Sequence, residues 1–203
     1  MATQLMIGVS LAACAGLRAW LPLLMVGLLA HFHYVTLGSS YAFLANDNAL
    51  IIFGIATVVE VVADKILGLD HLMDTIGTVI RPAAGTILSS AMLTHVDPTT
   101  ATVLGLIVGG TTSLTIHAGK AAARIKTTAL SPLHAGAGNA TVSTFEDALA
   151  VAGPWAAIHY PAATFAVTVM LLIVAGFMVY HLFKTGKKVS HFFKNRGRSS
   201  LGI

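Results

Sequence analysis

Apolar residues run along this chain in long uninterrupted stretches rather than in the narrow stripes of a soluble protein. Several stretches of 16 or more residues contain no acidic or basic side chain. A helix built from such a stretch is long enough to cross the hydrocarbon core of a bilayer. The pattern predicts six apolar segments, at residues 4–30, 48–66, 78–95, 101–124, 143–158 and 160–183.

Composition leads to the same class of protein. The 203 residues are 56% hydrophobic and only 10% charged, with a mean hydropathy of +0.81. A soluble domain of this length needs more charge than this to cover its surface. We therefore expect an all-α polytopic membrane protein, with one transmembrane domain at residues 1–183 and a basic tail at 184–203.

The bases are distributed unevenly between the two sides that six alternating segments would create. The connections at 31–47 and 96–100, and the one around His159, contain no Lys or Arg. Because cytoplasmic loops are enriched in these residues, the pattern predicts that both termini are cytoplasmic. The bases on the predicted cytoplasmic side are the six of the tail together with Lys65, Arg81, Lys120, Arg124 and Lys126.

A weak internal repeat supports a two-part architecture. Residues 10–19 and 113–122 agree at five of ten positions when laid side by side. Under the predicted topology the two stretches run in opposite directions, as in the inverted repeats of many secondary transporters. We expect repeats at about 4–95 and 101–183; the alternative is that small-residue helices look alike because they pack closely.

Arg18 is the one base that no loop accounts for, since it lies in the middle of the first apolar segment. Gly16 precedes it, and Pro22 removes a helix hydrogen bond four residues later. This combination predicts an interrupted helix, with Arg18 facing the protein interior. The fifth segment, at 143–158, is short for a span and is the one expected to be tilted, re-entrant or sunk beneath one surface. The arginine would line a polar cavity or be locked in a buried ion pair, with Glu60, Glu146 or Asp147 as the candidate carboxylate.

Other ionisable residues recur at helical spacing. His117, Lys120 and Arg124 share one helix face, while Glu60 and Asp64 are four apart with Lys65 adjacent. We expect the two groups to face each other, either as a structural ion-pair network or as a charged vestibule for a ligand.

Two further polar stretches have simpler interpretations. Residues 143–146, Ser-Thr-Phe-Glu, have the spacing of a capping box that opens the fifth segment, which leaves the carboxylate of Asp147 for another role. The stretch around Asp70, His71 and Asp74 predicts a short amphipathic helix at the inner interface.

Chemistry that depends on a cofactor finds little support. No Walker loop, dinucleotide-binding glycine pattern, HExxH or GxSxG motif is present, so no cofactor and no enzyme class is predicted. The basic tail favours binding to anionic lipid headgroups rather than to nucleic acid. Metal binding has only weak candidates, the histidines expected on the outer side: His31, His33, His95 and His159.

Several stretches occur together in one order: GLRAWLPLL at 16–24, VEVVADKILGLDHLMDTIGTVIRPAAG at 59–85, HAGKAAAR at 117–124 and STFEDALA at 143–150. Together they resemble the bacterial membrane proteins grouped as domain of unknown function 4126, over about residues 5–180. The resemblance implies a multi-pass protein of the bacterial inner membrane. It supplies no activity, but it supports treating the polar positions as one constellation.

Three classes of function remain open. The leading hypothesis is a small transporter or channel, with a mild preference for an anionic solute or a phosphate-bearing lipid and with a polar site near the interrupted first helix. The second is an integral-membrane enzyme acting on lipid, with Glu60, Asp64 or Glu146 as acid or base. The third is a structural or assembly protein, a homo-oligomer included, that packs through the glycines at 105, 109 and 110.

Overall fold

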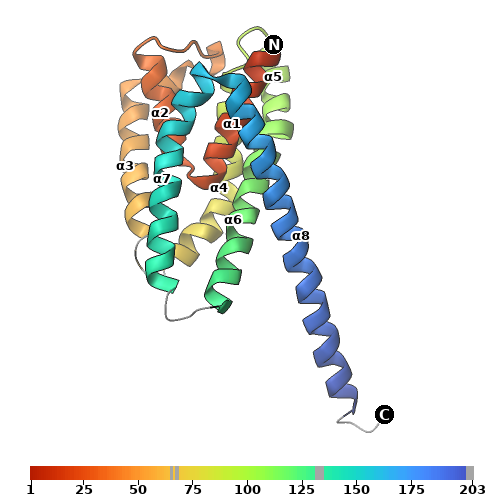
Figure 1. The fold of residues 1–203 in the computed structure, drawn as a ribbon. Helices are drawn as coiled ribbons and strands as arrows, with labels where there is room; N and C mark the ends of the chain where they lie inside the picture. Colours follow the sequence, from red (N-terminus) through yellow and green to blue (C-terminus); the bar gives the residue numbers. More distant parts are fainter. Residues whose placement is uncertain (65, 67–68, 131–134, 200–203) are drawn as a thin grey trace.

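The computed structural model describes residues 1–64, 66, 69–130 and 135–199, with the backbone alone at 69–71, 124–130, 135–142 and 185–199. These residues contain eight α-helices, one 3-10 helix and one π-helical segment, and no strand (Figure 1). The expected all-helical class is confirmed. In chain order the elements are α1 (Ala2–Leu17), α2 (Trp20–His31), a 3-10 helix (Ser39–Ala45), α3 (Asp47–Ala63), α4 (Leu69–Ala91), α5 (Pro98–Leu104), the π-helical segment (Gly105–Gly110), α6 (Thr111–Leu130), α7 (Ala135–His159) and α8 (Pro161–Ser199).

The first apolar stretch is broken at Arg18, as predicted. Arg18 has extended backbone angles, φ −139° and ψ 129°, between the end of α1 and the start of α2. In a continuous helix the ring of Pro22 would clash with the carbonyl of the residue four positions earlier, which is Arg18. After the break, Pro22 lies in the first turn of α2, where its missing N–H leaves no helix bond unmade.

After the break the chain turns back toward the end of the bundle from which it came. Near the start of α1, the amide nitrogen Nε2 of Gln4 donates to the hydroxyl of Thr94 at 2.7 Å. Beyond the end of α2, the Gly38 amide donates to the carbonyl of Ala91 at 2.8 Å. Both contacts lie at the C-terminal end of α4, so α1 and α2 form a re-entrant hairpin. Residues 17–20 are its tip.

The other helices alternate in direction along the bundle (Figure 1). Helix α3 leads away from the end where the hairpin enters, α4 returns, α5 and α6 lead away as one stack, α7 returns and α8 leads away again. The N-terminus and the end of α8 consequently lie at opposite ends of the bundle. The structure therefore has a returning hairpin where the sequence predicts a single crossing by residues 4–30, and the side of the membrane on which each terminus lies stays a prediction.

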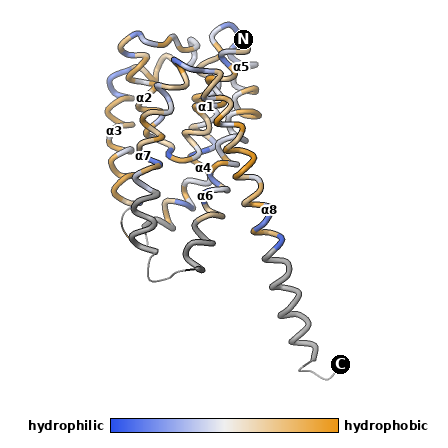
Figure 2. Tube along the Cα trace, in the orientation of Figure 1, coloured by the Kyte–Doolittle hydropathy of each residue, from blue (hydrophilic) through white to orange (hydrophobic). Residues whose placement is uncertain are grey.

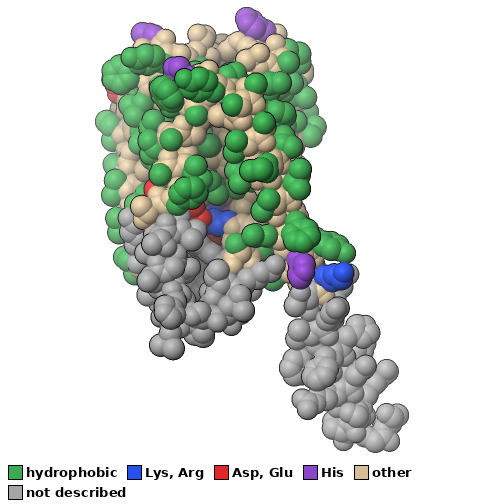
Figure 3. Space-filling view, viewed as in Figure 1, with side chains coloured by type: hydrophobic (Ala, Val, Ile, Leu, Met, Phe, Trp, Pro, Cys, Tyr) green, Lys and Arg blue, Asp and Glu red, His purple; other side chains and the backbone are tan. Residues whose placement is uncertain are grey.

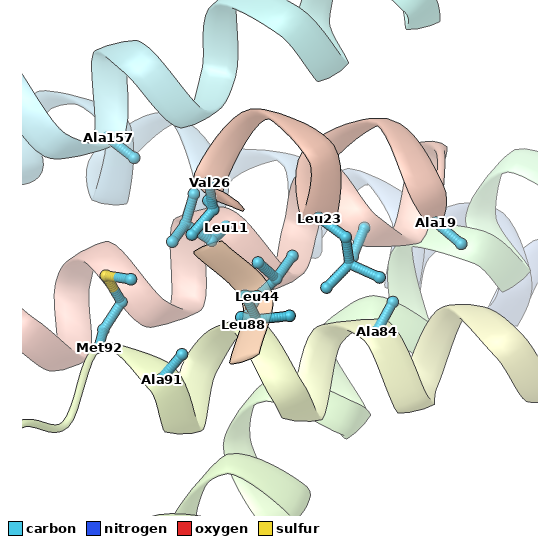
Figure 4. Close-up of a cluster of buried hydrophobic side chains, with 11 residues drawn as sticks. Leu11, Ala19, Leu23, Val26, Leu44, Ala84, Leu88, Ala91, Met92 and Ala157 are labelled. Carbon is cyan, nitrogen blue, oxygen red and sulfur yellow. The ribbon is translucent and has the colours of Figure 1, made fainter. Parts of the chain in front are cut away.

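Small and branched apolar side chains fill the space between the hairpin and α4 (Figure 4). Leu11 on α1, Val26 on α2 and Leu88 on α4 are all 0% exposed. On another side of α4, glycines let the backbone of the π-helical segment pack directly against the helix. A Cβ atom at Gly105 would come within 1.9 Å of the Ser90 hydroxyl, and one at Gly109 within 2.4 Å of the Gly85 carbonyl. The hairpin and the π-helical segment therefore both pack against α4, and the buried side chains of the hairpin are part of the core of the bundle.

Hydrophobic residues predominate along much of α3 and α8 (Figure 2), and apolar side chains cover much of the surface seen in Figure 3. On α3, Ile51, Ile55 and Val62 are each more than half exposed, and on α8 so are Met170 and Ile173. In the part of the chain that the structure describes, two stretches, Pro98–Ala123 and Pro161–Lys184, are long and apolar enough to cross a membrane. A third is added if Ser39–Ala45 and Asp47–Ala63, bent by 63°, count as one span. Membrane association is thus plausible on two or three helices, fewer than the six segments expected.

Candidate functional site

Arg18 occupies the hairpin tip and is completely buried. Its Nη2 lies 2.9 Å from Oδ2 of Asp64, which caps the C-terminus of α3, and donates to the Ser143 hydroxyl of α7 at 2.8 Å. Its Nε lies 2.8 Å from Oδ1 of Asp147, one turn further along α7. One guanidinium therefore joins the hairpin to two helices that are remote in sequence, as its planar, multidentate geometry allows.

The two helix ends created by the break are each matched by a charge of the favourable sign. Both carboxylate oxygens of Glu60, on α3, accept backbone amides at the start of α2, from Ala19 at 3.1 Å and from Trp20 at 3.2 Å. At the end of α1, the Lys120 ammonium on α6 donates to the Leu17 carbonyl at 3.3 Å. A helix N-terminus favours an anion and a C-terminus a cation, so these side chains stabilise an interruption that would otherwise leave polar backbone groups unsatisfied.

Lys120 also joins the tip to α7, because its Nζ lies 2.5 Å from Oε2 of Glu146. Both side chains are less than a tenth exposed. Removing either charge at this depth would be costly, since the other would remain in a poorly solvated site. Helix α7 is therefore fastened to the hairpin region twice, through Arg18 and through Lys120.

A second buried arginine extends the cluster toward α4 and α6. Arg81 is 2% exposed; its Nη2 lies 4.0 Å from Oε1 of Glu60, and its Nη1 lies 3.7 Å from Oδ1 of Asp74. The same Nη1 contacts Nδ1 of His117, whose Nε2 lies 3.3 Å from the Thr78 hydroxyl. Since a guanidinium can only donate, Nδ1 of His117 must be the acceptor.

These contacts define one buried ion cluster around the hairpin tip. It is formed by Arg18, Glu60, Asp64, Asp74, Arg81, His117, Lys120, Glu146 and Asp147. A family model described as Domain of unknown function (DUF4126) matches residues 5–181, which include every member of the cluster. The chain belongs to this family. No curated protein and no solved structure matches it.

The DUF4126 match ends at residue 181, so the basic tail lies outside it. In the structure the tail continues α8, which runs without interruption to Ser199 and projects beyond the bundle (Figure 1). The six bases of the tail all lie within this helix, at positions 184–198.

The cluster brings together most of the residues singled out from the sequence, but not in the expected pairs. Asp147 is one of the three carboxylates expected beside Arg18, whereas Asp64 was assigned to the facing stripe. Glu60 reaches His117 through Arg81 rather than directly. Lys65 and the side chain of Arg124 lie outside the described part of the chain.

The capping-box interpretation of residues 143–146 is wrong. Helix α7 begins at Ala135, so Ser143 lies two turns inside it. The Ser143 hydroxyl contacts Arg18, and the Glu146 carboxylate pairs with Lys120. The local spacing matches a capping box, but tertiary partners use both side chains.

Arg81 and Thr78 were not recognised as members of the cluster, and Asp74 was placed on a surface helix. Helix α4 begins at Leu69, so all three lie on one continuous helix. The spacing of Asp74, Thr78 and Arg81, at i, i+4 and i+7, is the signal that could have found this polar face. The side chains of Asp70 and His71 lie outside the described set.

The four weak metal candidates are not gathered into one site. Nδ1 of His31 contacts the Ala45 carbonyl at 3.0 Å, and Nδ1 of His159 contacts the carbonyl of Trp155 at 2.9 Å. His33 and His95 are exposed. Within the described ranges, no group of three or more His, Cys, Asp or Glu side chains is arranged to hold a metal ion.

Proposed function

We propose that the protein is a small transporter or channel that moves a small charged solute past the hairpin tip. The observation that carries this proposal is a re-entrant hairpin whose interrupted backbone meets a buried ion cluster. Transporters use broken helices in this way, because unwound backbone and charged side chains at membrane depth are tolerated where they line a polar path. Ionisable groups at such depth are expensive and most often functional.

The membrane arrangement in this proposal has five crossings and one re-entrant hairpin, so it adds α4 and α7 to the three spans that length and composition support. The crossings are α3, α4, α5 with α6, α7 and α8. At the end where α6 stops and α8 projects, α6 carries Arg124 and Lys126 and the extension of α8 carries the tail bases. The connections at the opposite end have no Lys or Arg. The positive-inside rule then puts the C-terminus in the cytoplasm of a bacterium and the N-terminus on the outer side.

The proposal keeps an inverted repeat for two pairs of helices, α3 with α4 and α7 with α8. Helices α3 and α4 run in the opposite directions to α7 and α8, as an in-plane pseudo-two-fold axis requires. The first and fourth segments differ, because one is a hairpin and the other is a stack interrupted only by the π-helical segment. Superposing 47–91 on 135–183 tests the relation, and an alignment only about the membrane normal would rule it out.

The chemical class of the solute is left broad in this proposal. Among the described side chains, the cluster holds three basic groups, Arg18, Arg81 and Lys120, and carboxylates from three helices. Both signs of charge meet at the tip, so the sequence-based preference for an anion or a phosphate-bearing lipid is no stronger than that for a small cation or zwitterion.

The test is a flux screen in proteoliposomes with inorganic cations, small anions and zwitterions. The informative variant is Arg18→Lys, which keeps the charge but not the planar fork. Losing one charge-assisted hydrogen bond of about 1.5–3 kcal/mol corresponds to a reduction in flux of roughly 10- to 100-fold if that bond supports transport. Gln4→Ala is the matched control, because Gln4 contacts Thr94 at the far end of α1.

Unchanged flux in Arg18→Lys, with normal folding, would remove Arg18 from the path. An absence of flux for every solute in the native protein would favour the second candidate, a structural protein with an ionic core. That candidate is supported by the pairing at the tip, where both helix ends and the guanidinium each have a countercharge.

A further inference from the structure

His117 is buried on α6 and faces the guanidinium of Arg81 on α4. Because Arg81 donates to Nδ1, the imidazole proton is assigned to Nε2, which points to the Thr78 hydroxyl at 3.3 Å. The Thr78 hydroxyl donates to the carbonyl of Asp74 at 3.1 Å, so its oxygen can accept from Nε2. The contacts are mutually consistent only with a neutral imidazole.

The charged groups around His117 come from three helices. Arg81 and Asp74 face it from α4, with Asp74 also 3.7 Å from Arg81. Lys120 lies one turn further along α6, and Glu146 of α7 pairs with this lysine. A proton added to Nδ1 would turn an acceptor into a donor against Arg81 and would add a positive charge beside Arg81, one helical turn from Lys120.

The guanidinium has a second carboxylate within reach. Its Nη2 is 4.0 Å from Oε1 of Glu60, which is longer than a hydrogen bond and leaves room to close. That oxygen also accepts the Ala19 amide at the start of α2. Closer approach by Arg81 therefore competes with the backbone amide for Glu60.

We propose that His117 is a proton-binding site that controls the hairpin tip, and that the proton is the ion to which transport is coupled. A proton taken up from water at Nδ1 displaces Arg81 from the imidazole toward Glu60. Glu60 then holds the start of α2 less firmly, and the tip loosens. The coupling role rests on the transport function proposed above, whereas the proton site does not.

Trp20 offers a direct reporter of the tip. Its amide donates to Oε2 of Glu60 at 3.2 Å, and its indole ring stacks on Phe53 with centroids 6.2 Å apart. The chain has two tryptophans, so Trp155→Phe leaves Trp20 as the single emitter. Emission is recorded in lipid nanodiscs from about pH 8 to about pH 3, a range that spans ordinary imidazole titration and extends well below it.

We expect one reversible change in Trp20 emission on acidification. His117→Asn should abolish it, because the amide oxygen can accept from Arg81 near the Nδ1 position but does not titrate. His117→Gln is the second non-titrating variant, and circular dichroism at pH 8 establishes that each is folded. His159→Asn, at the opposite end of α7 from the cluster, is the control and should keep the wild-type midpoint.

Two results would overturn the proton site: an unshifted transition in folded His117→Asn or His117→Gln, or a flat wild-type trace across the range. The flux screen separates this from the transport proposal. A His117-dependent transition in a protein that moves no solute refutes transport and the coupling role, while the proton site stands. If solute flux is unaffected by a pH gradient while the His117-dependent change in Trp20 emission is still observed, only the coupling role is refuted.

Discussion

Replacing Arg18 by methionine should destabilise the protein by about 3–5 kcal/mol, the usual cost of breaking a buried ion pair from one side. The structure identifies where this cost arises. The Asp64 side chain is 1% exposed and loses the guanidinium 2.9 Å away, whereas Asp147 is 20% exposed and can hydrate. For a protein of this size the loss corresponds to a fall in Tm of roughly 6–20 °C.

A second substitution separates charge from packing. Asp64→Asn, added to Arg18→Met, removes the buried carboxylate charge and should recover at least half of the lost stability, since replacing both charges of a buried pair is often close to neutral. Asp47→Asn is the matched control, because Asp47 is 80% exposed at the far end of α3 and should recover nothing.

Thermal unfolding in a mild detergent, followed by circular dichroism, measures all four proteins under the same conditions. The reasoning fails if Arg18→Met unfolds within 2 °C of the native protein. It also fails if the asparagines at 64 and 47 recover stability equally, because the buried carboxylate would then not be the source of the cost.

Three further outcomes are expected. Gly16→Ala should lower stability by about 1–3 kcal/mol, because the added Cβ would lie 2.6 Å from the Ser113 carbonyl on α6. Gly54→Ala is the control: its Cβ meets nothing within 4 Å, so the substitution should be neutral or stabilise by up to about 1 kcal/mol. Equal Tm values for the two variants would contradict this prediction. In a cysteine-free background, Thr3→Cys and Lys184→Cys should react with impermeant thiol reagents from opposite sides of the membrane, and labelling from one side would contradict the hairpin. The pKa of Asp97 should be below its usual value, because hydrogen bonds from the side chain and the backbone amide of Thr100, and from the amide of Thr99, favour the charged carboxylate. The stabilisation that the Asp97 carboxylate gives to the start of α5 is then complete above the ordinary aspartate pKa, and it is lost as the pH falls through the lowered pKa of Asp97. An NMR titration of Asp97 with an ordinary aspartate midpoint would contradict this prediction.

Hydropathy was sufficient to predict the helical class, and local sequence was sufficient to predict the break. Gly16 and Pro22 flank Arg18 closely enough to make a continuous helix unfavourable. The direction of the chain after the break was not predictable in the same way, because the apolar run 4–30 is as long as one crossing. The return is set by contacts with residues 91–94, and nothing in the hairpin sequence encodes them locally.

The pairing within the cluster was harder to predict than its membership. The sequence places Arg81 at the cytoplasmic edge of a segment that begins at residue 78, whereas α4 begins nine positions earlier, at Leu69, so Arg81 lies about three turns inside the helix. Ser143 and Glu146 matched a local motif whose side chains are in fact used by Arg18 and Lys120. In both cases a partner distant in sequence determined the role, and spacing along one helix carries no information about such partners.

The position of Arg18 also constrains how the protein can be made. The hairpin is synthesised before the other helices of the bundle, yet Ser143, one of the groups that hold its tip, follows Arg18 by 125 positions. At 5–20 residues per second, this delay is roughly 6–25 s. During that time the guanidinium has no native contact with α7, and an exposed arginine is poorly tolerated in hydrocarbon. In the membrane arrangement proposed above, we therefore expect the hairpin to reach its final position only after α7 has been made, although its two helices are synthesised earlier than α7.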